Sequence, residues 1–202
     1  MVLQLILLCA LAALVELDDT YVAQLGVSSP LVAGVLFGWL TGDVSSGLQT
    51  GAFMTLLLLD YTPVGGVIGP NGAVAVFCTL ILVMFGMSIY LAFFAGVVCG
   101  ILFRTFERFY RTYMGRFMLR REKAMQLVPE KAITAFIAAG LTLQFLLTFI
   151  FLLCFTAAAK EIVNILPDEL PEKLTLALKL SFFAVPWIGV MMAFKKFTFK
   201  AR

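Results

Sequence analysis

Long uninterrupted apolar stretches constrain the fold of this chain more than any other feature of its sequence. Residues 132–159 contain no charged side chain, and residues 174–194 contain only Lys179. Each stretch is long enough for an α-helix to cross a bilayer, which takes about 20 residues. Hydrophobic residues make up 62% of the chain and charged residues 13%, whereas soluble domains average about half apolar and a quarter charged. Lipid must therefore be part of the solvent of this protein.

The bilayer restricts the choice of secondary structure. In hydrocarbon every backbone amide must be paired within the protein, which leaves α-helices or closed β-barrels. The apolar stretches are continuous and do not alternate with polar residues, so they favour helices. The sequence predicts an all-α integral membrane protein with multiple transmembrane helices. Residues 1–15 lack the basic start of a secretory signal and are predicted to be a retained membrane helix.

The positive charge lies entirely in the second half of the chain. All 15 Lys and Arg residues lie at or after Arg104, and the first 103 residues carry only acidic charges. Since Lys and Arg next to membrane segments mark the cytoplasmic side, segments 104–123 and 195–202 are predicted to be cytoplasmic. The two apolar stretches between them then place residues 160–173 outside, with a turn at 167–171.

The N-terminal half has short apolar pieces separated by Gly- and Pro-containing breaks. The pieces at 31–40 and 48–59 are too short to cross a bilayer. They predict broken or re-entrant helices, which persist at membrane depth only where protein buries them or they line a watery cavity. In transporters such helices build the substrate site. Ordinary loops between short tilted helices are the alternative. A longer helix is predicted over 73–103.

We therefore expect three regions: an N-terminal membrane region at 1–103, a basic amphipathic segment at 104–131, and a membrane helix pair with a basic tail at 132–202. In the basic segment, aromatic residues recur at helical spacing on one face and arginines flank them. The aromatic residues are Phe103, Phe106, Tyr110, Tyr113 and Phe117. This pattern suits an amphipathic helix in the headgroup region. The alternatives are the plain cytoplasmic end of a membrane helix and an arginine face that docks a soluble partner.

Several functional classes are disfavoured. The chain has no histidine, which excludes a phosphohistidine, a histidine base and most zinc sites. Its four cysteines lie in apolar stretches without a CxxC motif, as expected of buried packing residues. There is no glycine-rich phosphate loop, HExxH or acidic metal motif. No enzymatic activity, cofactor, metal or nucleic-acid partner is expected.

An ordered series of motifs carries the functional information. It comprises Leu-Asp-Asp at 17–19, Pro-Leu-Val-Ala-Gly at 30–34, Gly-Trp-Leu-Thr-Gly-Asp at 38–43, Gly-Leu-Gln-Thr-Gly-Ala at 47–52, Val-Gly-Gly at 64–66 and Gly-Pro-Asn at 69–71. Over roughly residues 17–85 this series resembles the IIC subunit of the mannose-fructose-sorbose class of phosphotransferase permeases. Ser29 stands where that family usually has arginine, and Thr55 where many members have glutamate.

The resemblance implies the membrane channel subunit of a phosphoenolpyruvate-dependent sugar phosphotransferase system. Such a subunit translocates a hexose or amino sugar while partner subunits phosphorylate it. The implied partners are a IID membrane subunit, soluble IIB and IIA phosphocarriers and further copies of the chain as a homo-oligomer, all at the bacterial plasma membrane. IIC carries no phosphate itself, which agrees with the lack of histidine. The alternative is an assembly or regulatory subunit that keeps the fold without transporting.

Within this series, polar residues in apolar surroundings are the candidate sugar-binding residues. They are Asp43, Gln49, Thr55 and Asn71. Carboxylates and amides bind sugar hydroxyls by directed hydrogen bonds, and ionisable groups in membrane segments are functional candidates. Structural roles remain open: a helix N-cap for Asp43, a turn for Asn71 and a polar contact between helices for Gln49. Asp18 and Asp19 can be the interfacial end of a helix.

Overall fold

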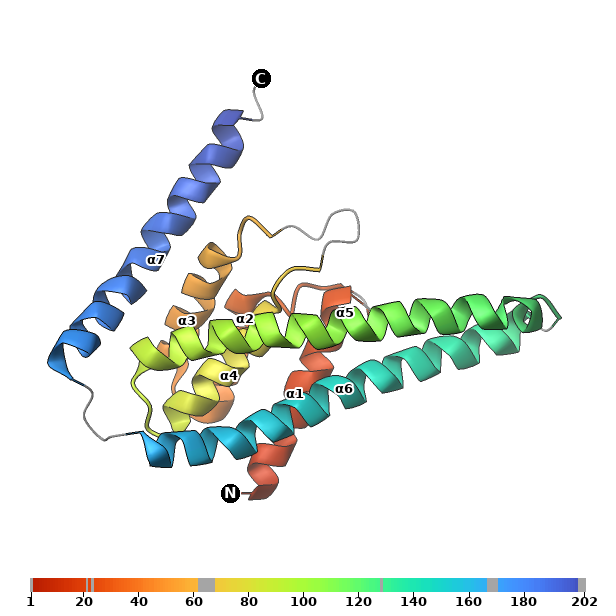
Figure 1. The fold of residues 1–202 in the computed structure, drawn as a ribbon, viewed down its shortest axis with the longest axis horizontal. Coiled ribbons are helices and arrows are strands. Elements are labelled where there is room, and N and C mark those ends of the chain that lie inside the picture. The colour runs from red at the N-terminus through yellow and green to blue at the C-terminus, as the bar shows by residue number, and fades with distance from the viewer. Residues whose placement is uncertain are drawn as a thin grey trace.

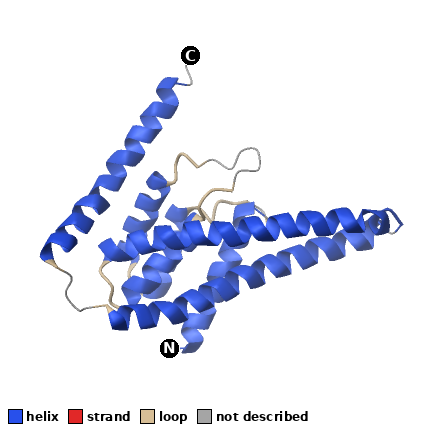
Figure 2. Ribbon diagram, viewed as in Figure 1, coloured by secondary structure: helices blue, strands red, loops and turns tan. Residues whose placement is uncertain are grey.

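The computed structural model of the chain describes residues 2–20, 22, 24–61, 68–127, 129–166 and 171–199 (Figure 1). Within these residues all regular secondary structure is helical, as predicted (Figure 2). The helices are α1 (Val2–Thr20), α2 (Pro30–Thr41), α3 (Val44–Leu57), α4 (Gly72–Met84), α5 (Ile89–Leu127), α6 (Pro129–Ile165) and α7 (Glu172–Phe199). Three segments of α5, α6 and α7 are long and apolar enough to cross a membrane, namely Ile89–Phe117, Ile133–Ile165 and Glu172–Lys195. The chain is an all-α membrane protein.

Helices α2 and α3 form a tight hairpin that is too short to span a bilayer. They have 12 and 14 residues, or about 18 and 21 Å at 1.5 Å per residue, against a hydrocarbon core of about 30 Å. The turn uses Gly42 in a left-handed conformation, with φ of 87°. The helix axes approach closely because glycines face one another: a Cβ on Gly34 would lie 2.4 Å from the carbonyl oxygen of Gly47. The sequence prediction of broken helices in this half is confirmed.

The single long helix predicted over 73–103 is wrong, because the chain folds back in the middle of it. Helix α4 ends at Met84 and α5 begins at Ile89. Gly86 lies between them with φ of 101°, a backbone conformation that favours glycine. The two helices then pack closely in opposite directions, and a Cβ on Gly100 of α5 would lie 2.7 Å from the Asn71 carbonyl oxygen at the start of α4.

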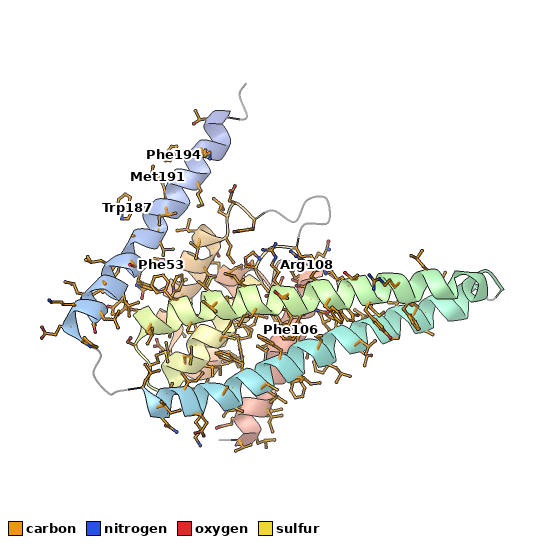
Figure 3. All side chains as sticks on the ribbon, viewed as in Figure 1. Phe53, Phe106, Arg108, Trp187, Met191 and Phe194 are labelled. Atoms are coloured by element: carbon orange, nitrogen blue, oxygen red, sulfur yellow. The ribbon has the colours of Figure 1, made fainter. Side chains whose placement is uncertain are left out.

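The apolar core surrounds α4. Every residue from 73 to 82 is buried, and α4 contacts α1, α2, α3, α5 and α6. Phe77 of α4 meets Phe37 of α2 edge to face, with ring centroids 5.3 Å apart. Phe182 attaches α7 to this core through Phe93 of α5, at 5.1 Å. The outer side of α7 exposes Trp187, Met191 and Phe194 (Figure 3), an apolar surface suited to lipid or another membrane chain.

Helices α5 and α6 form a long hairpin that extends beyond the other helices (Figure 1). Helix α5 passes through residue 104 without a break, so the described basic segment is its second half. Part of the aromatic stripe packs on α6: Phe103 and Phe106 contact Phe151, and the Tyr110 hydroxyl donates to the Gly140 carbonyl oxygen at 2.7 Å. Arg108 lies on the other side of α5 from Phe106 (Figure 3). This arrangement favours the alternative interpretation of the basic segment, the extended end of a membrane helix.

The topology predicted from the basic residues can be tested with single cysteines. The turn predicted at 167–171 lies almost wholly outside the described residues, but Asn164 before it and Thr198 near the C-terminus are both described and exposed. In a cysteine-free background, cysteine at Asn164 should react with an impermeant maleimide in intact cells, because that end of α6 is predicted to be outside. Cysteine at Thr198 should react only after permeabilisation. Reaction of both from the same side would contradict the topology.

Candidate functional site

A cavity of about 590 Å³ lies where the ends of four helices meet the middle of α5. Its walls come from the C-terminal ends of α1 and α3, the loops that lead into α2 and α4, and one face of α5. Its charged and strongly polar lining residues include Asp18, Asp19, Thr55, Asn71, Glu107 and Arg111. The volume lies within the range of small-molecule sites, about 300–1,000 Å³. The cavity is therefore the candidate site of this structure.

Asn71, on the cavity wall, is held by hydrogen bonds of both its side chain and its backbone amide. It is the N-cap of α4, where its Oδ1 accepts from the Val74 amide at 3.0 Å. Its backbone amide donates to the Gly100 carbonyl oxygen at 3.3 Å, and its Nδ2 donates to Glu16 Oε1 at 3.3 Å. The capping role left open by the sequence is thus present, and the same side chain lines the cavity.

Thr55 also lines the cavity, from the last turns of α3. Its hydroxyl donates to the Gly51 carbonyl oxygen at 2.8 Å, so its proton is used within the helix. The hydroxyl oxygen keeps acceptor capacity for a ligand donor. Two of the four residues singled out from the sequence therefore share one cavity.

Asp43 and Gln49 do not line this cavity. Asp43 is exposed at the turn between α2 and α3, where it caps α3 by accepting from the Ser46 amide at 3.0 Å. The hydrogen bonds from the Ser46 side chain and backbone hold the pKa of the Asp43 carboxyl below its usual value. Helix α2 separates this turn from the cavity by about 18 Å of helix length. Gln49 is half-buried on α3, and a sugar-binding role for either residue stays a prediction.

Asp18 holds the loop that leads into α2. Its carboxylate accepts from the backbone amides of Leu25 at 2.8 Å, Val27 at 2.7 Å and Ser28 at 3.3 Å. This loop forms one wall of the cavity. Asp18 is therefore more than the interfacial end of α1, since it fixes the shape of that wall.

Glu107 and Arg111 are cavity residues that the sequence analysis missed. Arg111 Nε donates to Glu107 Oε1 at 3.1 Å, and Arg111 Nη2 contacts the same oxygen. Glu107 is only 1% exposed. Glu107 is the one acidic residue between Arg104 and Arg121, four positions before Arg111, a spacing at which helical side chains pair. This isolated acid among arginines was the sequence feature that could have indicated the Glu107–Arg111 pair.

Glu16 is a second missed residue, and it lies directly behind the cavity wall. It is 1% exposed in α1 and accepts from Gln144 Nε2 at 3.1 and 3.2 Å, from Asn71 Nδ2, and from the Thr148 hydroxyl at 2.9 Å. Gln144 and Thr148 are one turn apart in the apolar stretch of α6. A carboxylate inside an apolar helix is a functional signal in the sequence, but its partners are distant along the chain.

Comparison with solved structures supports the all-α membrane fold. No curated protein sequence matches the chain significantly. Among the solved chains that resemble it, two align over 98% of this chain and 80% of the other chain at 22% identity. One is described only as the structure of a membrane protein, with a TM-score of 0.83. The other comes from a complex of the mannose transporter ManYZ with microcin E492, with a TM-score of 0.66. At this identity the likeness shows the fold.

The family is shown by the sequence itself. The motif series suggested it over roughly residues 17–85, and the match to a family profile extends much further along the chain. Residues 2–200 match the family described as the sorbose-specific IIC component of the PTS, the phosphotransferase system, and the chain belongs to that family.

Proposed function

We propose that this chain is the membrane channel subunit of a sugar phosphotransferase system and that the cavity beside Asn71 receives the sugar. The hexose or amino sugar would cross through this subunit while partner subunits phosphorylate it. The observation that carries the proposal is one cavity of about 590 Å³ that combines carboxylates, an amide, a hydroxyl and an arginine at the ends of short helices.

The chemistry of the cavity suits a sugar. A sugar hydroxyl both donates and accepts, so it needs acceptors such as the Glu107 and Asp19 carboxylates and donors such as Arg111. The short helices α2 and α4 begin at the cavity and α3 ends there, as the interrupted helices of transporters do at their substrate sites. We propose Asn71 and Thr55 as sugar contacts on the core side of the cavity and Glu107 with Arg111 on the α5 side.

The predicted topology gives the cavity a direction. Glu107 and Arg111 lie near the end of the candidate span Ile89–Phe117, within the basic segment 104–131 whose residues 104–123 are predicted to be cytoplasmic. The cavity then opens toward the cytoplasm, where soluble phosphocarrier subunits act. This chain supplies the path, and phosphoryl transfer belongs to those IIA and IIB subunits.

The partner subunits would use different surfaces. The exposed apolar side of α7 around Trp187, Met191 and Phe194 suits a IID membrane subunit or a further copy of this chain in a homo-oligomer. Arg108 and Arg116 are exposed on the cytoplasmic half of α5 and suit the phosphate-bearing IIB subunit. The same proposal places the protein in the bacterial plasma membrane.

Uptake of radiolabelled L-sorbose and D-mannose tests the function, in cells that express the chain with its partner subunits and lack other permeases of this class. Asn71→Ala should raise the apparent KM about five- to tenfold, since one hydrogen bond contributes on the order of 1 kcal/mol. Thr55→Val should raise the KM less. Asp43→Asn is the comparison, because Asp43 lies outside the cavity.

The outcomes separate the alternatives. If Asn71→Ala has the KM of the wild type and Asp43→Asn loses sugar uptake, the sugar site lies at the turn of the α2–α3 hairpin. No uptake of any hexose or amino sugar tested by the wild-type complex, with the complex still assembled in the membrane, would favour the non-transporting assembly subunit.

A further inference from the structure

Glu16 carries a buried carboxylate whose partners in the described residues are neutral. Three side chains from outside α1 donate to it: Asn71 before α4, and Gln144 and Thr148 of α6. Taking a carboxylate out of water is expensive unless its lone pairs are satisfied. Four hydrogen bonds from three residues on one acid indicate a structure built around that acid.

The two carboxylate oxygens connect the cavity wall to α6. Oε1 accepts from Asn71 Nδ2 and from Gln144 Nε2, while Oε2 accepts from Gln144 Nε2 and lies 2.9 Å from the Thr148 hydroxyl. Asn71 is the only one of these partners that lines the cavity within the described chain. The position of α6 is thereby linked, through one acid, to a proposed sugar contact.

The same bonds fix the orientation of the Asn71 amide. Its Oδ1 is held by the Val74 amide and its Nδ2 by Glu16. A carboxylate accepts only, so it selects the NH₂ end of the amide. Within the described residues the second Nδ2 hydrogen has no hydrogen-bond partner, so Asn71 can donate it to a sugar oxygen in the cavity.

We propose that Glu16 is the positioning residue of the sugar cavity, holding the Asn71 amide in the orientation that presents its second N–H to the sugar. The inference rests on the proposed function of the cavity. Glu16 itself does not line the cavity and acts through Asn71.

A purely structural role is the competing explanation, and the chain provides a matched control for it. Cys9 Sγ and the Thr156 hydroxyl lie 3.5 Å apart, a second buried polar contact between α1 and α6. Neither residue lines the cavity. Thr148→Val and Thr156→Val each remove one hydroxyl from the same helix, but only Thr148 contacts Glu16.

The experiment measures KM and Vmax for uptake of L-sorbose and D-mannose by the assembled complex. Glu16→Leu should raise the KM about as much as Asn71→Ala, roughly fivefold or more, with amounts of complex normalised. The double variant Glu16→Leu/Asn71→Ala should have a KM no higher than that of either single variant, because both substitutions remove the same hydrogen bond. Thr148→Val should raise the KM about twofold and Thr156→Val should leave it unchanged.

Glu16→Gln supplies the conservative variant. Its amide oxygen can still accept from Asn71, and its NH₂ can donate to Gln144 Oε1, a buried atom without a hydrogen-bond partner in the present arrangement. Rotation of the Gln144 amide makes that pairing possible, so Glu16→Gln should restore a KM within about twofold of wild type. If Glu16→Leu does not reach the membrane, two other comparisons replace it as the test. The KM of Thr148→Val is then compared with that of Thr156→Val, and the KM of Glu16→Gln with that of Asn71→Ala.

The results distinguish failure of the positioning role of Glu16 from failure of the proposed sugar transport. If wild-type complex takes up sugar but Glu16→Leu and Thr148→Val change the KM no more than Thr156→Val does, the positioning role of Glu16 is overturned and the function stands. The positioning role is also overturned if the KM effects of Glu16→Leu and Asn71→Ala multiply in the double variant. If the wild-type complex takes up no sugar, the proposed function fails and the positioning role fails with it.

Discussion

Gly47→Ala should leave little folded protein in the membrane. A Cβ on Gly47 would lie 2.3 Å from the Gly34 carbonyl oxygen and 2.7 Å from the Gly38 Cα. Both atoms belong to the backbone of α2, so no side-chain rotation can relieve the overlap and the hairpin must open. Overpacking of a well-packed site costs about 1–3 kcal/mol, and backbone atoms leave the least room to adjust. We expect a cost at or above the upper end of that range.

The measurement is the amount of chain in membranes, together with the midpoint of thermal unfolding in a mild detergent. Gly115→Ala is the matched control, because no atom other than those of its chain neighbours and its own helix backbone lies within 4 Å of a Cβ at that position of α5. It should be neutral or slightly stabilising, since alanine favours a helix by up to about 1 kcal/mol over glycine. Equal midpoints for the two variants would show that the α2–α3 hairpin is not packed through Gly47.

The parts of the fold that depend on local sequence were predicted well. The apolar stretches at 132–159 and 174–194 correspond to the spans Ile133–Ile165 and Glu172–Lys195. The short pieces at 31–40 and 48–59 correspond to α2 and α3. Span length and glycine spacing are properties of contiguous residues, so the sequence alone carries them.

The break between α4 and α5 was missed because Phe85, Met87 and their neighbours are nearly as apolar as the helices on either side. Gly86 makes the turn at positive φ, but glycine within an apolar stretch is equally compatible with an uninterrupted membrane helix. Packing decides between the two: Gly96 and Gly100 let α5 lie against α4.

The cavity was only partly visible in the sequence, for a related reason. Thr55 and Asn71 come from the recognisable motif region, but Glu107 and Arg111 of the cavity do not. Glu16 meets Gln144 across 128 positions of the chain. Glu107 was hidden among the arginines of a segment whose positive charge dominated its interpretation. Contacts of this kind follow from how the α5–α6 hairpin packs on α1 and α4, which no local pattern encodes.

Arg111→Met should destabilise the protein by about 3 kcal/mol, because removing one partner leaves the Glu107 carboxylate buried without its cation. Arg111 is 33% exposed and Glu107 only 2% by side chain, so the acid suffers most from the loss. Arg108→Met is the control on the same helix, since Arg108 is exposed, and exposed charges contribute about 0–1 kcal/mol. The midpoint of thermal unfolding in detergent should fall for Arg111→Met and change little for Arg108→Met.

The double variant Glu107→Gln/Arg111→Met separates the ion pair from other effects of Arg111. Replacing both members of a buried pair by neutral groups is often nearly neutral for stability, whereas breaking it is not. The double variant should therefore recover most of the unfolding midpoint lost in Arg111→Met. Its sugar uptake should stay low, because both side chains line the cavity. Stability recovered together with full uptake would remove the pair from the sugar site, and stability left unrecovered would mean that Arg111 supports the fold through contacts other than Glu107.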